Sequence, residues 1–378
     1  MNKIENTREE GYIEFNRSPK KNHEKLLDLE ESNPSFTSHK ALDYIISLII
    51  IVTGISLIVL SLAPFQITIA QPQITLPNQT FSDLKEKPFL QDISFDINNV
   101  TFSHHMASVN GIQLHYVIGG QGDPVVLLHG WPQTWYEWRH VMPALAKNYT
   151  VIVPDLRGLG DSSKPVSGYD GKTVAEDIYQ LVSQLGFKSI FLVGHDFGAE
   201  VAYPYAAAHP NEVKGLVMLD VPVLGIGPGK NLTGLWWLQF HLVRDVPEML
   251  VEGHEREYLT WFYRYTCNPE AITKDDIDVY VSHYAAPGGM RAGFEYYRAF
   301  PEDIKQNEQY SKVKLPMPVL ALGGQCSFGS AALDSMRMVA TDVRGGIVPD
   351  SGHWIPEERP AFLVDQLFKF FANATNNT

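Results

Sequence analysis

The chain has 378 residues, of which 44% are hydrophobic and 19% are charged, a composition typical of a globular protein. This length is sufficient for one large domain with an insertion or for two small domains. The formal net charge of −13 argues against nucleic acid as a partner, because that binding depends on neutralisation of phosphates by Lys and Arg.

The N-terminal region contains one long apolar run. Residues 1–43 are polar and mixed in charge, and we expect a disordered tail. Residues 44–65, YIISLIIIVTGISLIVLSLAPF, carry no charged side chain. A helix of about 20 apolar residues spans a bilayer, so we predict a transmembrane helix over residues 44–65. A buried core helix is the alternative, but it fits poorly because the run is apolar all round and precedes the rest of the fold.

Basic residues near this run predict its orientation. The tail that precedes it contains basic residues, among them Lys20, Lys21, Lys25 and Lys40. The first basic residue after it is Lys85. Because basic flanks stay in the cytoplasm, we expect a single-pass protein whose large domain is extracytoplasmic. A signal peptide cleaved before Gln71 is the alternative, although the long leader favours an uncleaved anchor.

Residues 66–103 are rich in Pro, Gln, Thr and Asn, and we expect a linker there. From residue 104 to residue 378, strand and helix patterns alternate. Runs of β-branched residues predict strands in GIQLHYVIGG, PVVLLHG and YTVIVPDLRG. TVAEDIYQLVSQLGF predicts an amphipathic helix, and SIFLVGHD predicts a strand buried on both faces. This alternation implies an α/β fold with a mostly parallel sheet. Aromatic, helical sequence from about 222 to 313 interrupts it and predicts a lid.

The sequence contains two cysteines, Cys267 and Cys326. Two cysteines cannot form a disulfide framework in a chain of this length. A single bridge is possible, but two buried free thiols are the interpretation that we favour. No Cys/His spacing indicates a zinc site, and we predict neither a metal nor an organic cofactor.

The most informative motif is GHDFGAE at residues 194–200. It has the pattern of the G-x-S-x-G nucleophile elbow, with Asp196 in place of serine. A predicted strand leads into it and the helical stretch FGAEVAYPYAAA follows, while Gly194 and Gly198 leave room for the sharp turn. A helix-capping aspartate is the alternative, but the strand–turn–helix context favours a nucleophile.

A carboxylate nucleophile suits a particular kind of substrate. It attacks a saturated carbon, such as that of an epoxide or an alkyl halide, and forms an ester that water must then hydrolyse. His353 in DSGHWIPEE follows the last predicted strand and is the expected base, rather than a buried structural histidine. The backbone N–H groups of Trp131 and Phe197 are expected to form the oxyanion hole.

Together these motifs resemble the epoxide hydrolase and dehalogenase branch of the α/β-hydrolase fold family. The motifs occur in the family's order between about residues 104 and 373: VVLLHGWPQTWYEWR, DLRGLGDSSKP, GHDFGAEVAY, FEYYRAF and SGHWIPEERP. The resemblance implies an α/β-hydrolase fold with a helical lid. Tyr297 in FEYYR resembles the lid tyrosine that protonates the epoxide oxygen, with core packing as the alternative and as the expected role of Tyr296.

The chain departs from the epoxide hydrolase pattern at two positions. The usual triad acid follows MPVLALGG, where this chain has QCSFG without a carboxylate. Some family members carry the acid at the end of the strand before the lid, so Asp220 is assigned to His353, with Asp350 as the alternative. The second lid donor is usually a histidine, and Trp237 takes its place here. His241, one helical turn later, is a possible substitute.

We therefore predict an epoxide hydrolase, an ether-bond hydrolase that forms vicinal diols through an aspartyl ester. A haloalkane dehalogenase is the alternative, but Trp131 and Phe197 occupy the positions of its usual halide donors. A second alternative is a catalytically silent, membrane-tethered binding domain. We expect a small, uncharged and apolar substrate. The lid aromatics either contact it or form the core of the lid: Trp236, Trp237, Phe240, Trp261, Phe262 and Tyr263.

Overall fold

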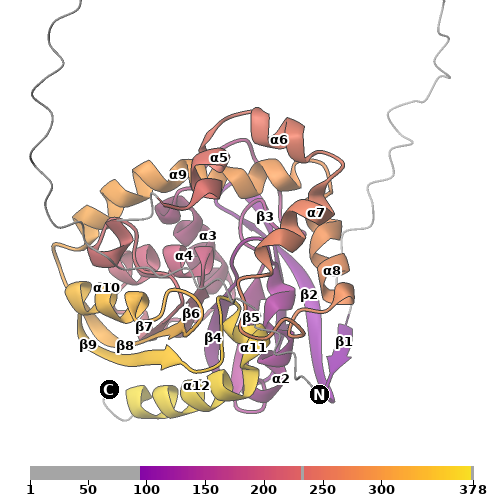
Figure 1. Ribbon diagram of the computed structural model, residues 1–378. Coiled ribbons are helices and arrows are strands. Elements are labelled where there is room, and N and C mark those ends of the chain that lie inside the picture. Colours follow the sequence, from indigo (N-terminus) through magenta and orange to yellow (C-terminus); the bar gives the residue numbers. More distant parts are fainter. Residues whose placement is uncertain (1–93, 231–233, 376–378) are drawn as a thin grey trace, which may run out of the picture. The chain divides into compact units, whose positions relative to one another are not determined.

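The structure is a computed structural model and describes residues 94–230 and 234–375 (Figure 1). The predicted tail, the transmembrane helix at 44–65 and the linker as far as residue 93 lie outside these ranges, so these predictions stay predictions. Within the described ranges, no helix combines the length and apolar character that crossing a membrane requires.

A nine-stranded sheet lies at the centre of the described chain, in the order β1-β2-β3-β5-β4-β6-β7-β8-β9. Its strands are β1 (Ser94–Ile97), β2 (Val100–Val109), β3 (Ile112–Gly119), β4 (Asp123–Leu128), β5 (Tyr149–Pro154), β6 (Ile190–His195), β7 (Val213–Leu219), β8 (Leu315–Gly324) and β9 (Ala340–Val348). In this order, the pairs β1–β2, β2–β3 and β3–β5 are antiparallel, and every neighbouring pair from β5 to β9 is parallel. The predicted α/β fold with a mostly parallel sheet is confirmed.

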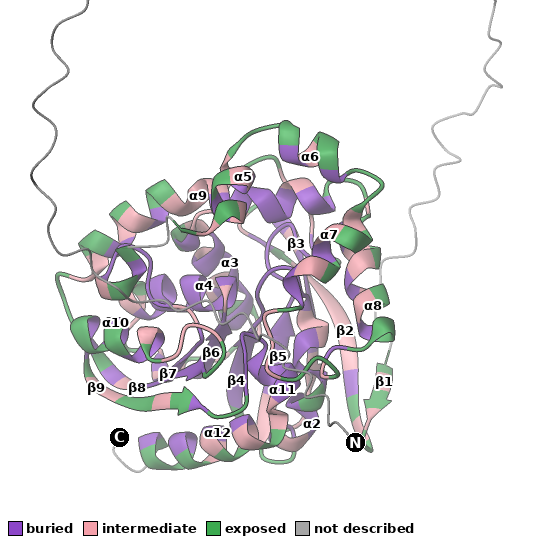
Figure 2. Cartoon of the chain, in the orientation of Figure 1, coloured by how far each residue is buried: buried purple, intermediate pink, exposed green. Residues whose placement is uncertain are grey.

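Helices cover both faces of this sheet. They are η2 (Trp135–His140), α2 (Met142–Leu145), α3 (Gly171–Gln184), α4 (Phe197–Ala208), α10 (Ala331–Val339), α11 (Ile355–Glu358) and α12 (Pro360–Thr375). Residues of β4 alternate between two cores, because successive side chains of a strand point to opposite faces. Val126 and Leu128 pack on the side of α3, α4 and α10, whereas Val125 and Leu127 pack on the side of α2 and α12. Figure 2 shows the buried centre that results.

The predicted lid forms the connection between β7 and β8. It consists of η3 (Gly227–Lys230), α5 (Trp236–Leu242), α6 (Val246–Val251), α7 (Glu255–Phe262), α8 (Lys274–Tyr284) and α9 (Gly289–Tyr310). In Figure 1, α5, α6 and α7 lie in the upper part of the view, and α8 lies at the right, at the height of β2. The lid is therefore a helical insertion at the place in the chain that the sequence indicated.

The sheet begins earlier than expected. We assigned residues 66–103 to a linker, but β1 and β2 form a hairpin that starts at Ser94. Asn98 and Asn99 connect these strands with φ of 50° and 63°. Two-residue hairpin turns of type I′ require positive φ at both positions, and Asn adopts it more readily than most residues. The Asn-Asn pair was the sequence signal for this hairpin.

The expectation of two free thiols was wrong. Cys267 and Cys326 form a disulfide with their Cα atoms 5.8 Å apart. The two residues are 59 positions apart in the sequence, and only the packing of the lid on the β8 end of the sheet brings them together. No local sequence pattern indicates such a pairing.

Candidate active site

Asp196 lies at a sharp turn between a buried strand and a helix. β6 ends at His195 and α4 begins at Phe197. Asp196 has φ of 50° and ψ of −120°, a conformation that is rare for an L-residue. A side chain at Gly194 would collide with the backbone of Gly198, and one at Gly198 would collide with the carbonyl of Leu128. The two glycines therefore permit the turn, as the elbow motif predicts.

The structure brings Asp196, His353 and Asp220 together from three separate segments. His353 Nε2 lies 3.5 Å from Asp196 Oδ2, and His353 Nδ1 lies 2.5 Å from Asp220 Oδ2. Asp220 directly follows β7, and His353 lies in the loop between β9 and α11. Asp220 is fully buried. The imidazole thus lies between two carboxylates, in the arrangement of a nucleophile, a base and an orienting acid.

The alternative acid, Asp350, does not reach the histidine ring. Its side chain is 82% exposed and pairs with Arg359 at 3.0 Å. Asp220 instead accepts two further hydrogen bonds, from Gly324 N–H at 2.8 Å and from Ser327 Oγ at 2.7 Å. These donors fix the carboxylate against His353.

The three groups influence each other's pKa values. Burial would raise the pKa of Asp196, but the hydrogen bond and charge of His353 outweigh it and lower the pKa below its ordinary value. Burial would lower the pKa of His353, but the hydrogen bonds to Asp196 and Asp220 raise it to about 10. In the resting protein at neutral pH, Asp196 is therefore ionised and His353 is protonated.

The two predicted oxyanion donors lie on either side of the nucleophile. Trp131 N–H donates to Asp196 Oδ1 at 2.8 Å. Phe197 is the first residue of α4, and the first N–H groups of a helix have no partner within it. Within residues 94–230 and 234–375, the Phe197 N–H has no hydrogen-bond acceptor. Both amides are therefore suited to donate to an oxygen at Asp196.

Tyr297 of α9 lies above the nucleophile, among aromatic rings. Its ring centroid is 4.8 Å from that of Phe197 and 5.4 Å from that of Trp131. Burial and the charge of Asp196 raise the pKa of Tyr297 well above its usual value. Its hydroxyl forms no hydrogen bond with the described part of the protein. The neighbouring Tyr296 donates to the carbonyl of Arg157 at 2.8 Å and so has a packing role, as expected.

His241, and not Trp237, lies beside Tyr297. The ring centroids of His241 and Tyr297 are 4.3 Å apart. His241 Nε2 bonds to the Tyr258 hydroxyl at 2.5 Å, while its buried Nδ1 has no partner. Burial, with a smaller effect of Arg298, lowers the pKa of His241 to about 3, so the ring is neutral.

Trp237 lies among other aromatic side chains of the lid. Its ring packs against Trp261, Phe262 and Tyr265, with centroids 5.4–6.0 Å apart. The other lid aromatics differ in how far they are buried. Trp236 is 51% exposed, whereas Phe262 is buried with its ring 4.7 Å from that of Trp131. Most of these side chains therefore form the core or surface of the lid.

The sequence did not single out a buried pair beneath the nucleophile. Glu137 Oε1 lies 3.0 Å from His195 Nδ1, and His195 Nε2 bonds to the carbonyl of His353 at 2.8 Å. Burial would lower the pKa of His195, but the charge of Glu137 outweighs it and raises the pKa. The histidine of GHDFG was visible in the motif, but its partner on η2 lies 58 residues earlier and carried no signal.

Among the described residues, one group of three side chains has donor atoms close enough to hold a metal ion: His115, Asp155 and Asp161. His115 Nδ1 lies 2.7 Å from Asp155 Oδ2, which also accepts from Asp161 N–H at 3.0 Å. Asp155 Oδ1 accepts from Trp135 N–H at 2.8 Å. These bonds use the carboxylate to join three segments of the chain, and none involves Asp196 or His353.

Comparisons with known proteins show which proteins the chain resembles. Residues 123–360 match a family model described as alpha/beta hydrolase fold. The chain is 39% identical over 279 residues to the soluble epoxide hydrolase of Corynebacterium sp. (strain C12), covering 71% of this chain and 97% of that protein. It resembles the solved structure of epoxide hydrolase CorEH without ligand with a TM-score of 0.69 and 40% identity, covering 72% of this chain and 99% of that chain. The Cif epoxide hydrolase from Acinetobacter nosocomialis matches with a TM-score of 0.66 and 28% identity, covering 71% and 88%.

Proposed function

The chain belongs to the alpha/beta hydrolase fold family, and on this basis we propose that it opens epoxides to vicinal diols through a covalent ester on Asp196. It is an epoxide hydrolase-like α/β-hydrolase. The observation that carries the proposal is the position of Asp196 in the elbow, with His353 Nε2 3.5 Å from its carboxylate. A carboxylate at this position attacks alkyl carbon, whereas the serine of related hydrolases attacks acyl carbon.

In the first step, Asp196 attacks one epoxide carbon and the bond from that carbon to the epoxide oxygen breaks. The Tyr297 hydroxyl protonates the oxygen that is released, since its raised pKa keeps it protonated until the alkoxide forms. The neutral His241 donates a second hydrogen bond from Nδ1, which has no partner within the protein. The proton carried by His353 then restores Tyr297 and leaves the imidazole neutral.

In the second step, neutral His353 removes a proton from water, and the resulting hydroxide adds to the ester carbonyl carbon of Asp196. The N–H groups of Trp131 and Phe197 stabilise the oxyanion. The tetrahedral intermediate then expels the diol, which takes the proton of the intermediate's hydroxyl group. Asp196 returns as a carboxylate and His353 is again protonated, so atoms and charges balance over the cycle. Asp220 orients and stabilises the imidazolium throughout.

The surroundings of Asp196 favour a small, uncharged and apolar substrate. The ring of Tyr297 packs against those of Phe197 and Trp131, the two residues whose amides are next to the nucleophile, with centroids 4.8 Å and 5.4 Å apart. His241 is buried and neutral. The charge of His353 is already paired with Asp196 and Asp220, so an anionic substrate would lose its hydration without gaining a cationic partner among these side chains.

We also propose that the domain is held outside the cytoplasm by the predicted anchor at residues 44–65. The Cys267–Cys326 disulfide supports this location, because disulfides persist in oxidising compartments and are rare in the cytosol. Protease treatment of intact cells should digest the domain and leave a protected N-terminal fragment. Protection of the domain in intact cells and its digestion only after lysis would place it in the cytoplasm instead.

The activity can be tested by incubating the full-length chain, in detergent, with styrene oxide and with a bromoalkane in parallel. We expect diol from the first substrate and no bromide release from the second. Bromide without diol would make the protein a haloalkane dehalogenase. A folded protein that shows no diol and no Asp196 ester over a panel of epoxides would support the binding-domain alternative.

A further inference from the structure

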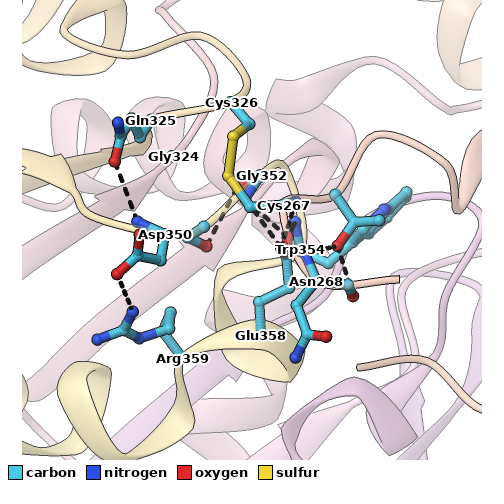
Figure 3. The surroundings of a disulfide bond; sticks show 12 residues. Cys267, Asn268, Gly324, Gln325, Cys326, Asp350, Gly352, Trp354, Glu358 and Arg359 are labelled. Carbon is cyan, nitrogen blue, oxygen red and sulfur yellow. Dashed lines mark hydrogen bonds and ion pairs between the residues drawn. A yellow bond between two sulfur atoms is a disulfide. The ribbon is translucent and has the colours of Figure 1, made fainter. Parts of the chain in front are cut away.

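The disulfide joins the lid to the loop that supports the catalytic histidine and its acid. Cys267 lies in the lid between α7 and α8, and Cys326 lies in the turn that follows β8. Figure 3 shows the bond bridging these two segments next to Gly352 and Trp354, which flank His353 in the sequence. Cys267 is half-buried and Cys326 is exposed, so a reductant can reach the bond.

The turn after β8 is bonded to Asp220 and to the loop that carries His353. Ser327, next to Cys326, donates through Oγ to Asp220 Oδ2 at 2.7 Å. The same carboxylate oxygen lies 2.5 Å from His353 Nδ1. Cys326 N–H donates to the carbonyl of Ser351 at 2.9 Å, two residues before the histidine. Because the disulfide holds Cys326, it also restricts the position of the adjacent Ser327.

The lid segment at Cys267 is bonded to the histidine loop as well. His353 N–H donates to the carbonyl of Tyr265 at 2.8 Å. The buried carboxylate of Glu358 accepts from Cys267 N–H at 2.8 Å and from Gly352 N–H at 2.9 Å (Figure 3). The lid and the histidine loop therefore share hydrogen bonds, and the disulfide adds a covalent link from the lid to the Ser327 turn.

We propose that Ser327, held in place by the Cys267–Cys326 disulfide, is a positioning residue for the Asp220–His353 pair and sets the rate of ester hydrolysis. This inference rests on the proposed two-step reaction. Asp220 Oδ2 orients His353 only while the carboxylate group keeps the orientation in which Oδ2 faces the imidazole. Ser327 is the side-chain donor that holds that oxygen. Loss of the hydroxyl or release of the turn allows the carboxylate to rotate and the imidazole to tilt. Ester formation uses Asp196 and Tyr297 and does not depend on this rotation.

The test uses the full-length chain and measures the two half-reactions separately. After rapid mixing with styrene oxide and acid quenching, mass spectrometry gives the fraction of Asp196 present as ester over time. We expect Ser327→Ala to slow ester hydrolysis about tenfold, the effect of losing one hydrogen bond to a charged group, with ester formation unchanged. Ser327→Thr should restore most of the rate. Ser330→Ala is the matched control, since Ser330 is exposed and bonds to Asp334 instead.

The disulfide is tested by reduction and by a Cys267→Ser, Cys326→Ser double variant. A phosphine reductant supplies two electrons and becomes its oxide, and two protons from water complete the two thiols. Both forms should accumulate ester and hydrolyse it more slowly, at a temperature well below unfolding. A lower melting temperature with an unchanged hydrolysis rate would show a structural role only and overturn the proposal. Absence of any ester in the unmodified protein would instead refute the proposed function, so the two failures are distinguishable.

Discussion

His353 lies between Asp220 and Asp196, with Nδ1 2.5 Å from the first carboxylate and Nε2 3.5 Å from the second. The shorter contact orients the ring, and the longer one directs Nε2 to the carboxylate that becomes the ester. His353 therefore has two roles. In the resting protein it is the cation that pairs with both carboxylates, and during ester hydrolysis it is the base that activates water.

Asp220→Asn should slow ester hydrolysis by about 10²–10⁴-fold, because the imidazolium loses its charged partner and the correct tautomer is no longer enforced. Asp350→Asn is the matched control and should leave the rate unchanged, since Asp350 is exposed and pairs with Arg359. Quenched-flow detection of the Asp196 ester measures both rates. A larger effect from Asp350→Asn would transfer the role of the acid to that residue.

Tyr297→Phe should slow ester formation by about 10²-fold, within the range for loss of a general acid. Tyr296→Phe removes a hydroxyl from the adjacent position, but that hydroxyl bonds to the carbonyl of Arg157. The control variant should lose stability and keep its rate of ring opening. Equal rates of ester formation in the two variants would remove Tyr297 from the chemistry.

His241→Gln should slow ring opening, whereas Trp237→Phe should not. His241 lies 4.3 Å from Tyr297 between ring centroids and has an unpartnered Nδ1. Trp237 packs against Trp261 and Tyr265 instead. Single-turnover consumption of styrene oxide distinguishes the variants, and a slower reaction in Trp237→Phe alone would identify the indole as the second donor.

The charge of His353 predicts a pH dependence of stability. The pKa is raised from 6.5 to about 10 in the folded protein, so the folded state binds the proton more tightly than the unfolded chain does. The associated stabilisation is fully present below about pH 6.5. It is lost as the pH rises through about 10. Denaturant titrations from pH 6 to 10 should show a free energy of unfolding that falls with pH in the natural protein. The decline should be smaller in His353→Gln, and identical slopes would contradict the assignment.

The sequence predicted the parts of the fold that local patterns encode. The strand and helix before and after Asp196 followed from apolar runs and from Gly194 and Gly198. The β1–β2 hairpin was missed because polar composition outweighed the turn signal of Asn98 and Asn99. Its exposed and half-buried β1 strand has few apolar positions to indicate a sheet.

The remaining differences depend on packing between distant segments. Whether Trp237 or His241 lies beside Tyr297 depends on which face of α5 packs against α9. The spacing of the two residues along the helix does not determine which face this is. The Cys267–Cys326 bond and the Glu137–His195 pair join residues that are far apart in the chain. Their partners become identifiable only when the lid and η2 are placed against the sheet.

The central claim, a covalent ester on Asp196, is tested most directly by one turnover in ¹⁸O-water with the natural protein in excess over styrene oxide. The account predicts that the diol released in this first turnover contains no ¹⁸O, because its new oxygen comes from Asp196, and that the label appears in the Asp196 carboxylate. A first-turnover diol that carries ¹⁸O, with an unlabelled Asp196, would mean that water attacks the epoxide directly and would contradict the account.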